Sequence, residues 1–270
     1  MYFKNLVDIH NHTEHSFDAE FPVDEMCEAA IKKGLQTVAF TDHVEMDIYF
    51  KNNFDKTAIE SFADVKRAKE DFKGRIEVLK GIELGEATYD IDESEKLLKT
   101  NDYDVVIGSI HNLRNTPDFS MLDYTKLDID SLLKEYLFEL KELAAWGNFD
   151  TMAHITYPLR YMTGEYGIAV DMEKYKKDID EIFSLLIEKD KPVEINTSGF
   201  RQKIGTSMPN EPYIKSFREL GGKYVTFGSD AHTPKDIGSD IERGMELALN
   251  CGIKTMLIFR NRKPVEIPIE

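Results

Sequence analysis

Six of the seven histidines in this 270-residue sequence stand at or just beyond the ends of short apolar runs. Carboxylates occupy similar places at the end of two runs and in one following loop. Imidazoles and carboxylates, with no cysteine among them, suit catalytic Zn, Mn or Fe rather than a structural thiolate site. The candidate metal ligands are His10, His12, Asp18, His43, Glu83, His111, His154, Asp230 and His232.

Nine ligands exceed what one cation needs, which indicates two or three metal ions and at least one bridging carboxylate. Taken alone, His10 or His12 could be a hydrogen-bonded core histidine, Glu83 could cap a helix and Asp18 could begin a turn. If all these side chains were buried together without cations, many of their polar groups would lack a partner. The set therefore predicts metal binding.

Short apolar or β-branched runs that are candidate strands position these residues. They cover 6–10, 37–42, 76–84, 104–111, 150–154, 192–196 and 224–230. Amphipathic helical stripes lie between several of them, and Gly34, Gly74 and Gly147 stand where left-handed helix caps are expected. Alternating strands and helices predict parallel strand pairing and therefore an α/β fold. Within this class we expect a closed or nearly closed β/α barrel. The carboxyl ends of barrel strands share one face, which would gather the histidines there.

We expect one domain over residues 1–270, because no Pro/Gly/Ser-rich linker, repeat or low-complexity tract divides the chain. An open doubly wound sheet is the structural alternative. It would be favoured by a phosphate-binding glycine loop, but neither G-x-G-x-x-G nor G-x-x-x-x-G-K-[ST] follows a candidate strand.

The composition argues against polyanionic partners. With 34 Lys+Arg and 50 Asp+Glu the net charge is -16, which disfavours binding to nucleic acid or anionic lipid. No apolar run approaches the ~18 residues of a membrane span, and the first residues lack a signal-peptide pattern. We therefore expect a cytoplasmic protein that binds neither nucleic acid nor membrane. Cys27 lies on an apolar helical stripe and is interpreted as a core residue.

Six motifs contain the candidate ligands: D-I-H-N-H-T-x-x-S-x-D at 8–18, T-D-H at 41–43, G-I-E at 81–83, S-I-H at 109–111, A-H at 153–154 and S-D-A-H at 229–232. In type and order they resemble the polymerase and histidinol phosphatase (PHP) family. The resemblance implies a distorted seven-stranded β/α barrel with three divalent metal ions, Zn, Mn or Fe.

Position by position, the resemblance implies a role for each ligand. His10, His12, Glu83 and Asp230 would surround a first ion, Glu83 would bridge to a second held by His111 and His154, and Asp18, His43 and His232 would hold the third. Some relatives carry histidine where this chain has Asp18. His15 has no counterpart and is expected to support the site or lie on the surface.

Within the family the chain is most similar to monofunctional histidinol-phosphate phosphatases. That similarity implies hydrolysis of L-histidinol phosphate to L-histidinol and phosphate in histidine biosynthesis, so the expected partner is a small phosphorylated substrate. The sequence does not indicate an oligomeric state.

A phosphomonoester carries about two negative charges, and the guanidinium fork of arginine matches phosphate oxygens. Arg160 and Arg201 are the first candidates for binding phosphate, and Arg114 and Lys203 stand in loops of the same face. Glu194 and Asn196 project to one side of their strand, where they either face the substrate or fill the barrel.

The candidate catalytic residues are Asp230, His43 and Arg160. The leaving alkoxide needs a proton, which His43 can supply if it is not fully committed to a metal; a metal-bound water is the alternative. Asp118 and Glu165 lie in long loops and are candidates for meeting the substrate ammonium.

Other functions remain open at this stage. A phosphodiesterase, nuclease or nucleotide phosphatase of the same family would need a basic, aromatic-lined groove to bind a strand. An amidohydrolase shares H-x-H on the first strand but resembles this chain less in G-I-E and S-D-A-H. A non-catalytic metal-binding module would be expected to have lost ligands, whereas all nine positions are filled.

Overall fold

The protein is represented by a computed structural model that describes residues 3–270. Its strands form one sheet in the order β1-β2-β4-β5-β6-β7-β8-β9-β10, with β3 paired to β4. The strands are β1 (Val7–Asp8), β2 (Thr37–Phe40), β3 (His43–Glu45), β4 (Glu77–Gly85), β5 (Val105–Ser109), β6 (Thr151–Met152), β7 (Val193–Asn196), β8 (Tyr224–Gly228), β9 (Thr255–Arg260) and β10 (Lys263–Pro268). All pairs are parallel except β9 with β10. The predicted α/β class is confirmed, and each of the seven predicted runs contains a strand.

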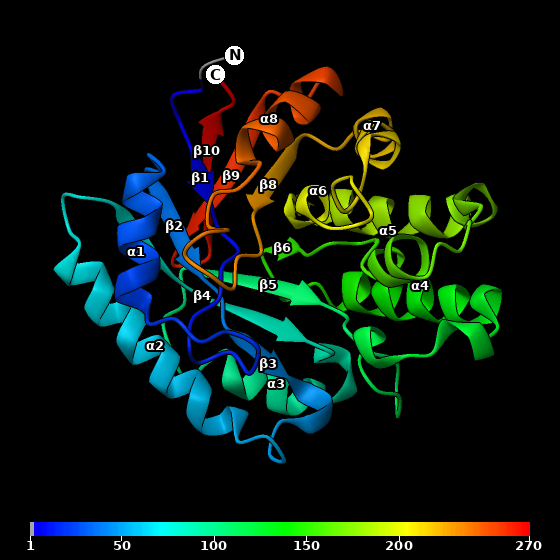
Figure 1. The fold of residues 1–270 in the computed structure, drawn as a ribbon, viewed down its shortest axis with the longest axis horizontal. Helices are drawn as coiled ribbons and strands as arrows, with labels where there is room; N and C mark the ends of the chain where they lie inside the picture. The colour runs from blue at the N-terminus through cyan, green and yellow to red at the C-terminus, as the bar shows by residue number, and fades with distance from the viewer. Residues whose placement is uncertain (1–2) are drawn as a thin grey trace.

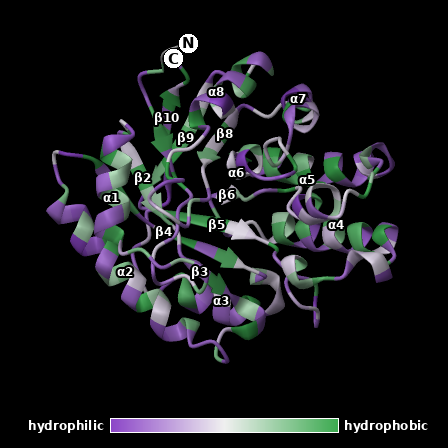
Figure 2. Ribbon diagram, viewed as in Figure 1, coloured by the Kyte–Doolittle hydropathy of each residue, from purple (hydrophilic) through white to green (hydrophobic). Residues whose placement is uncertain are grey.

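Helices connect the parallel strands and cover the outside of the sheet (Figure 1). They are α1 (Val23–Lys32), α2 (Phe54–Asp71), α3 (Ile91–Leu97), α4 (Ile129–Trp146), α5 (Lys176–Glu188), α6 (Ser198–Arg201), α7 (Glu211–Glu219) and α8 (Ile241–Asn250). Hydrophilic and hydrophobic residues alternate along these helices (Figure 2), as expected for helices that bury one face. The side chain of Cys27 is fully buried in the core beside α1, as predicted.

Predicted helix ends are also confirmed. Gly34, Gly74 and Gly147 have positive φ angles of 79°, 81° and 70°, which glycine adopts without a Cβ penalty. Gly147 ends α4 by donating its N–H to Leu143 O at 2.9 Å. None of the helices between residues 3 and 270 is long and apolar enough to span a membrane.

Strand β1 meets β8, so the first and last strands of the barrel lie together. Backbone N–H groups of Ile9 and His12 donate to Phe227 O and Ala231 O at 3.0 and 2.9 Å. The buried carboxylate of Asp8 adds to this junction, because it accepts hydrogen bonds from the N–H and Oγ of Ser229 at 2.8 and 2.5 Å. The ladder itself is not closed. With β2 and β4–β7 between them, β1 and β8 outline the expected distorted seven-stranded barrel.

Three strands were not predicted. Strand β3 extends the sheet next to the carboxyl end of β4 by three residues, and β9 and β10 form an antiparallel hairpin. Asn261 and Arg262 turn this hairpin with φ angles of 50° and 60°. The Arg262 N–H donates to Asp104 O at 2.9 Å, just before β5 begins. The hairpin turn therefore lies at the amino ends of the barrel strands, opposite the histidine motifs.

Candidate metal centre

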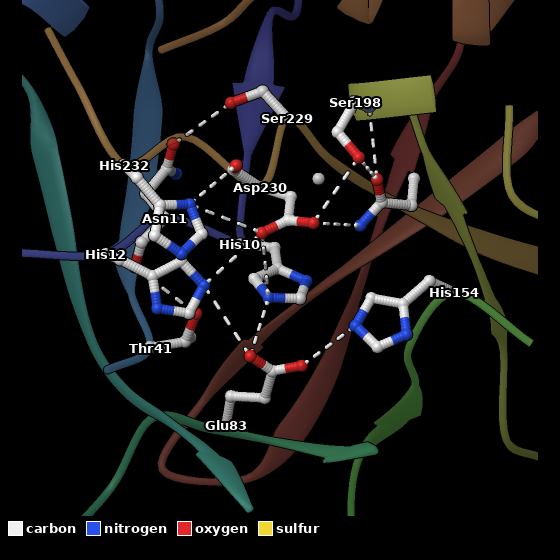
Figure 3. Close-up of polar contacts among 12 residues, drawn as sticks. His10, Asn11, His12, Thr41, Glu83, His154, Ser198, Ser229, Asp230 and His232 are labelled. Atoms are coloured by element: carbon white, nitrogen blue, oxygen red, sulfur yellow. Dashed lines mark hydrogen bonds and ion pairs between the residues drawn. The ribbon is translucent and has the colours of Figure 1, made fainter. Parts of the chain in front are cut away.

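Glu83, fully buried near the end of β4, is the central carboxylate of the site. Its Oε2 atom lies 3.1 Å from His10 Nε2, 3.6 Å from His12 Nε2 and 3.1 Å from His43 Nδ1. Its Oε1 atom lies 3.0 Å from His154 Nε2 on the other side. Figure 3 shows Glu83 and Asp230 approaching His10 and His12 from opposite sides. Both oxygens of Glu83 therefore face imidazole nitrogens, as a bridging ligand requires.

His111 completes the Oε1 side of Glu83. Its Nε2 atom lies 3.2 Å from Glu83 Oε1 and 3.3 Å from His154 Nε2. Strands β5 and β6 bring these two histidines to neighbouring positions, because His111 and His154 each follow the strand by two residues. This group is the one that the resemblance assigns to a second ion.

Asp230 and Asp18 stand on the opposite side of the cluster. Asp230 Oδ1 lies 3.5 Å from His12 Nε2 and 3.7 Å from His232 Nδ1. Asp18 is exposed at the opening, with Oδ2 3.1 Å from His232 Nε2 and Oδ1 3.7 Å from His43 Nε2. All nine candidate ligands therefore gather in one place.

The residues fit divalent metal ions. Five imidazole nitrogens of the ligand histidines are buried and have no hydrogen-bond partner among residues 3–270: His10 Nε2, His12 Nε2, His43 Nδ1, His154 Nδ1 and His232 Nε2. Three overlapping triads each have their donor atoms within 4.8 Å of one another: His10–His12–Glu83, His43–Glu83–His111 and His12–His43–His232. Overlapping triads with shared members indicate more than one cation.

The electrostatics of the cluster differ from one ligand to the next, since neighbouring carboxylates raise the pKa of His10, His43 and His111. Burial alone would raise the pKa of Glu83, but the charges of His10, His111 and His43 hold it well below its usual range. Burial, with His232 and His43 beside it, lowers the pKa of His12 to about 3. Glu83 is therefore ionised and His12 neutral near pH 7, which are the forms that bind metal.

Glu194 and Asn196, predicted to face either the substrate or the barrel interior, contact the ligand residues. Glu194 Oε1 lies 2.6 Å from His10 Nδ1, and its Oε2 accepts the N–H of His154 at 2.9 Å. Asn196 Nδ2 donates to Glu194 Oε2 at 3.2 Å. Both side chains are fully buried. Glu194 thus orients His10, leaving Nε2 of that ring directed at Glu83.

Sequence reasoning missed a similar pair behind His12. Ser16 Oγ lies 3.0 Å from His12 Nδ1 and donates to Asp42 Oδ1 at 2.8 Å. Both residues stand inside the quoted motifs, so their position beside ligands was the available signal. His15, the histidine without a ligand role, pairs with Asp64 at 2.9 Å and lies outside the cluster.

The three candidate arginines lie in different environments. Arg160 donates from Nη2 to Asp230 Oδ2 and Ser198 Oγ at 2.9 and 2.8 Å. Arg201 donates to the backbone oxygens of Ser229 and Asp230 at 2.7 and 2.9 Å, so it braces the segment that carries Asp230. Arg114 is half-exposed and stacks on Tyr89 with its guanidinium 4.0 Å from the ring centre.

Lys203, named only as a cation of the same face, is exposed and pairs with Glu165. Glu165, a candidate for the substrate ammonium, is therefore already matched with a cation. The other acidic candidate, Asp118, has no ion pair with a cation among residues 3–270.

A cavity of about 680 Å³ opens onto the ligands. Arg160 lies at the ligand end, with Asp230 and His232, while Arg114, Arg201, Glu194 and Asn196 are not among the lining residues. The rest of the lining is mixed. It includes the carboxylates Asp47 and Asp118, the cation Lys51, and aromatic or apolar side chains such as Phe17, Ile48, Met121, Tyr157 and Tyr161. The volume suits a small molecule.

Histidines and carboxylates that converge at the carboxyl ends of barrel strands, beneath a small-molecule cavity, define a metal-dependent hydrolase. The chain belongs to the PHP family: the family model described as "PHP domain" matches residues 8–198. This finding confirms the resemblance seen in the motifs.

The chain is similar along nearly its whole length to curated relatives. It is 29% identical to the probable histidinol-phosphatase of Clostridium acetobutylicum, covering 92% of this chain and 95% of the relative. It is 27% identical to the histidinol-phosphatase of Lactococcus lactis, covering 95% of each. A crystal structure of histidinol phosphate phosphatase from Lactococcus lactis, complexed with zinc, L-histidinol and phosphate, superposes with a TM-score of 0.84 at 23% identity, covering 97% of this chain and 99% of that one. That structure has the same fold.

Proposed function

We propose that residues 1–270 form one phosphoesterase domain that hydrolyses L-histidinol phosphate to L-histidinol and phosphate in histidine biosynthesis. The observation that carries the proposal is the cavity, whose lining combines candidate metal ligands and Arg160 with the carboxylates of Asp47 and Asp118. Such a cavity is complementary to a molecule with a phosphate and a cationic organic group. Relatives aligned over more than nine-tenths of the chain are named histidinol-phosphatases.

The nine ligands would hold three divalent ions in the grouping that the family resemblance implies. His10, His12, Glu83 and Asp230 hold one, Glu83 shares a second with His111 and His154, and Asp18, His43 and His232 hold the third. When bound, divalent ions supply an activated water and neutralise phosphate oxygens. Zn, Mn and Fe all suit this donor chemistry.

Residues of the chain orient the substrate. Arg160 has a buried Nε–H without a hydrogen-bond partner in the described chain, so its guanidinium keeps a donor for a phosphate oxygen after binding Asp230 and Ser198. His43 lies on the cavity wall and can donate a proton to the leaving alkoxide only if its ring is not committed to a metal ion, so this role is the alternative to its place in the third ligand group. Asp47 and Asp118, also on the wall, face the organic end of the substrate. A cytoplasmic location with no nucleic-acid partner agrees with the acidic composition and stays a prediction.

More than one metal ion per chain is the first expected result. Protein purified without chelator and loaded with Zn²⁺ or Mn²⁺ should contain two to three ions by elemental analysis, because three ligand triads overlap around Glu83. Thermal unfolding should move to higher temperature as metal is added, since the ions bind only the folded chain. A content that never exceeds one ion under saturating conditions would contradict the multinuclear centre.

Histidinol phosphate should be the best substrate by kcat/KM. The comparison set is a nucleoside monophosphate, an aryl phosphate and a short single-stranded DNA, measured side by side with the metal-loaded enzyme. A preference for DNA would instead favour a nuclease, and a preference for the nucleotide would favour a nucleotide phosphatase.

Asp118→Asn should raise KM for histidinol phosphate about 5- to 10-fold, equivalent to roughly 1–1.4 kcal/mol. The amide keeps the hydrogen bond that Asp118 Oδ1 accepts from Ser120 N but removes the charge that faces the substrate cation. Turnover of an aryl phosphate, which has no cationic group, should not change. Asp123→Asn is the matched control, because Asp123 caps the next turn through Thr125 N and does not line the cavity. Equal effects on both substrates would place the substrate cation elsewhere.

A further inference from the structure

Glu45, at the end of β3, contacts two candidate ligands although the motifs gave it no role. The side chain is buried, and its Oε1 atom lies 3.0 Å from Nδ1 of His43 and 3.0 Å from Nδ1 of His111. These histidines are separated by 68 positions in sequence. One carboxylate oxygen of Glu45 therefore contacts both histidine rings, which belong to different strand ends and both approach Glu83.

Glu86 lies directly behind Glu45. Its Oε1 atom accepts the backbone N–H of His111 at 2.6 Å and that of Asn112 at 3.3 Å. The other oxygens of the pair, Glu45 Oε2 and Glu86 Oε2, are buried and have no hydrogen-bond donor from another residue within 3–270. Donor atoms of Glu45, Glu86 and His111 lie within 4.8 Å of one another. The two carboxyl groups are thus in close proximity in a dry environment.

The surrounding backbone makes room for this pair. A Cβ atom on Gly85 would collide with Glu45 Oε2, so only glycine fits beside the carboxylate. Glu86 itself has a φ of 51°, a left-handed conformation that is costly for a residue with a Cβ. Gly85 and Glu86 end β4 in the conformation that turns the Glu86 side chain toward His111.

We propose that Glu45 is a positioning residue of the metal centre: its Oε1 atom accepts a hydrogen bond from Nδ1 of His111, lies against Nδ1 of His43, and fixes the tautomer in which Nε2 of His111 is directed at Glu83. Glu86 accepts the backbone N–H groups of His111 and Asn112 and so holds the His111 segment in place next to Glu45. The inference rests on the proposed function only in taking the nine ligands as metal-binding. Mutation of a residue that orients a metal-binding histidine in this way typically lowers metal affinity 10–100-fold.

Cobalt binding tests the proposal without any substrate. Metal-free wild-type protein and its Glu45→Gln variant are titrated with Co²⁺, and the visible absorption bands report both affinity and coordination. Because glutamine carries no charge and its amide oxygen is a weaker acceptor for the ring N–H of His111, Glu45→Gln should bind Co²⁺ about 10–100-fold more weakly and shift the bands. Glu86→Gln keeps a side-chain oxygen that can accept the backbone N–H of His111, and it should stay within about threefold of wild type.

Glu139→Gln is the matched control for Glu45→Gln, because it also places an amide at the position of a buried glutamate. Glu139 is a buried glutamate of α4 that pairs with Arg114 at 3.6 Å and contacts no histidine ring among those described. It should bind cobalt like wild type. The unfolding temperature of each metal-free variant separates a loss of folding from a loss of positioning.

Several outcomes would overturn the proposal. Unchanged cobalt affinity and spectrum in Glu45→Gln would do so, with or without lower stability of the metal-free protein. Equal losses of cobalt affinity in Glu45→Gln and Glu86→Gln would refute the division of roles between the two residues. If Glu45→Gln lost one cobalt ion and kept the remaining bands unchanged, Glu45 would be a direct ligand. Inactivity toward histidinol phosphate would refute the proposed substrate while leaving the cobalt result interpretable.

Discussion

Glu83→Ala is expected to abolish measurable phosphatase activity and to remove at least one metal ion per chain. Both oxygens of Glu83 face histidine nitrogens, Oε2 towards His10 and Oε1 towards His154, so no other single side chain serves both sides of the centre. Losing several kcal/mol of transition-state stabilisation corresponds to a decrease in kcat/KM of about 10³-fold or more. Elemental analysis and steady-state kinetics on the same preparation measure both effects.

Glu77→Ala is the matched control for this experiment. Glu77 begins the same strand, β4, but pairs with Arg260 at 2.6 Å, and it does not line the cavity. It should keep wild-type metal content and kinetics. Full metal content with full activity in Glu83→Ala would show that the carboxylate does not bridge.

Arg160→Ala should lower kcat/KM for histidinol phosphate about 10- to 150-fold while metal content is retained. One charge-assisted hydrogen bond to phosphate is worth roughly 1.5–3 kcal/mol. Metal binding should survive, because Arg160 contacts Asp230 Oδ2 whereas Oδ1 is the oxygen that faces His12 and His232.

Arg160→Lys and Arg75→Ala complete the arginine experiment. Lysine keeps the charge but not the planar fork, so it should recover only part of the activity. Arg75 pairs with Glu28 at 2.7 Å on the surface between α1 and α2, and its removal should leave the kinetics unchanged. If Arg160→Ala kept wild-type kinetics, Arg160 would not bind phosphate and would be only a structural partner of Asp230.

The sequence predicted the strands that carry ligands because each combines an apolar run with a polar motif at its carboxyl end. The hairpin of β9 and β10 was missed, since Thr255–Arg260 has no motif after it and pairs antiparallel. The ligands were found by residue type, and the structure brings all nine together. Their grouping around individual ions still depends on the resemblance.

The residues that orient the ligands were less predictable. Glu194 was noticed because it alternates with Asn196 on one strand, but its hydrogen bond to His10 spans 184 positions of sequence. Glu45 and Glu86 stand outside the quoted motifs, and their pairing depends on the positive φ of Glu86. Long-range contacts of this kind depend on how the strands are arranged in three dimensions, which residue types and local periodicity do not specify.

The junction between β1 and β8 has a consequence for how the chain folds. The hydrogen bond from Ser229 N to Asp8 spans 221 positions, and the ligands themselves extend from His10 to His232. Contacts of such high sequence separation form late, because a long loop must lose its conformational entropy before they contribute. During synthesis, β1 can pair with β2 early, but it must wait for β8 until most of the chain has left the ribosome. Metal acquisition is accordingly expected to follow, rather than to guide, the folding of the barrel.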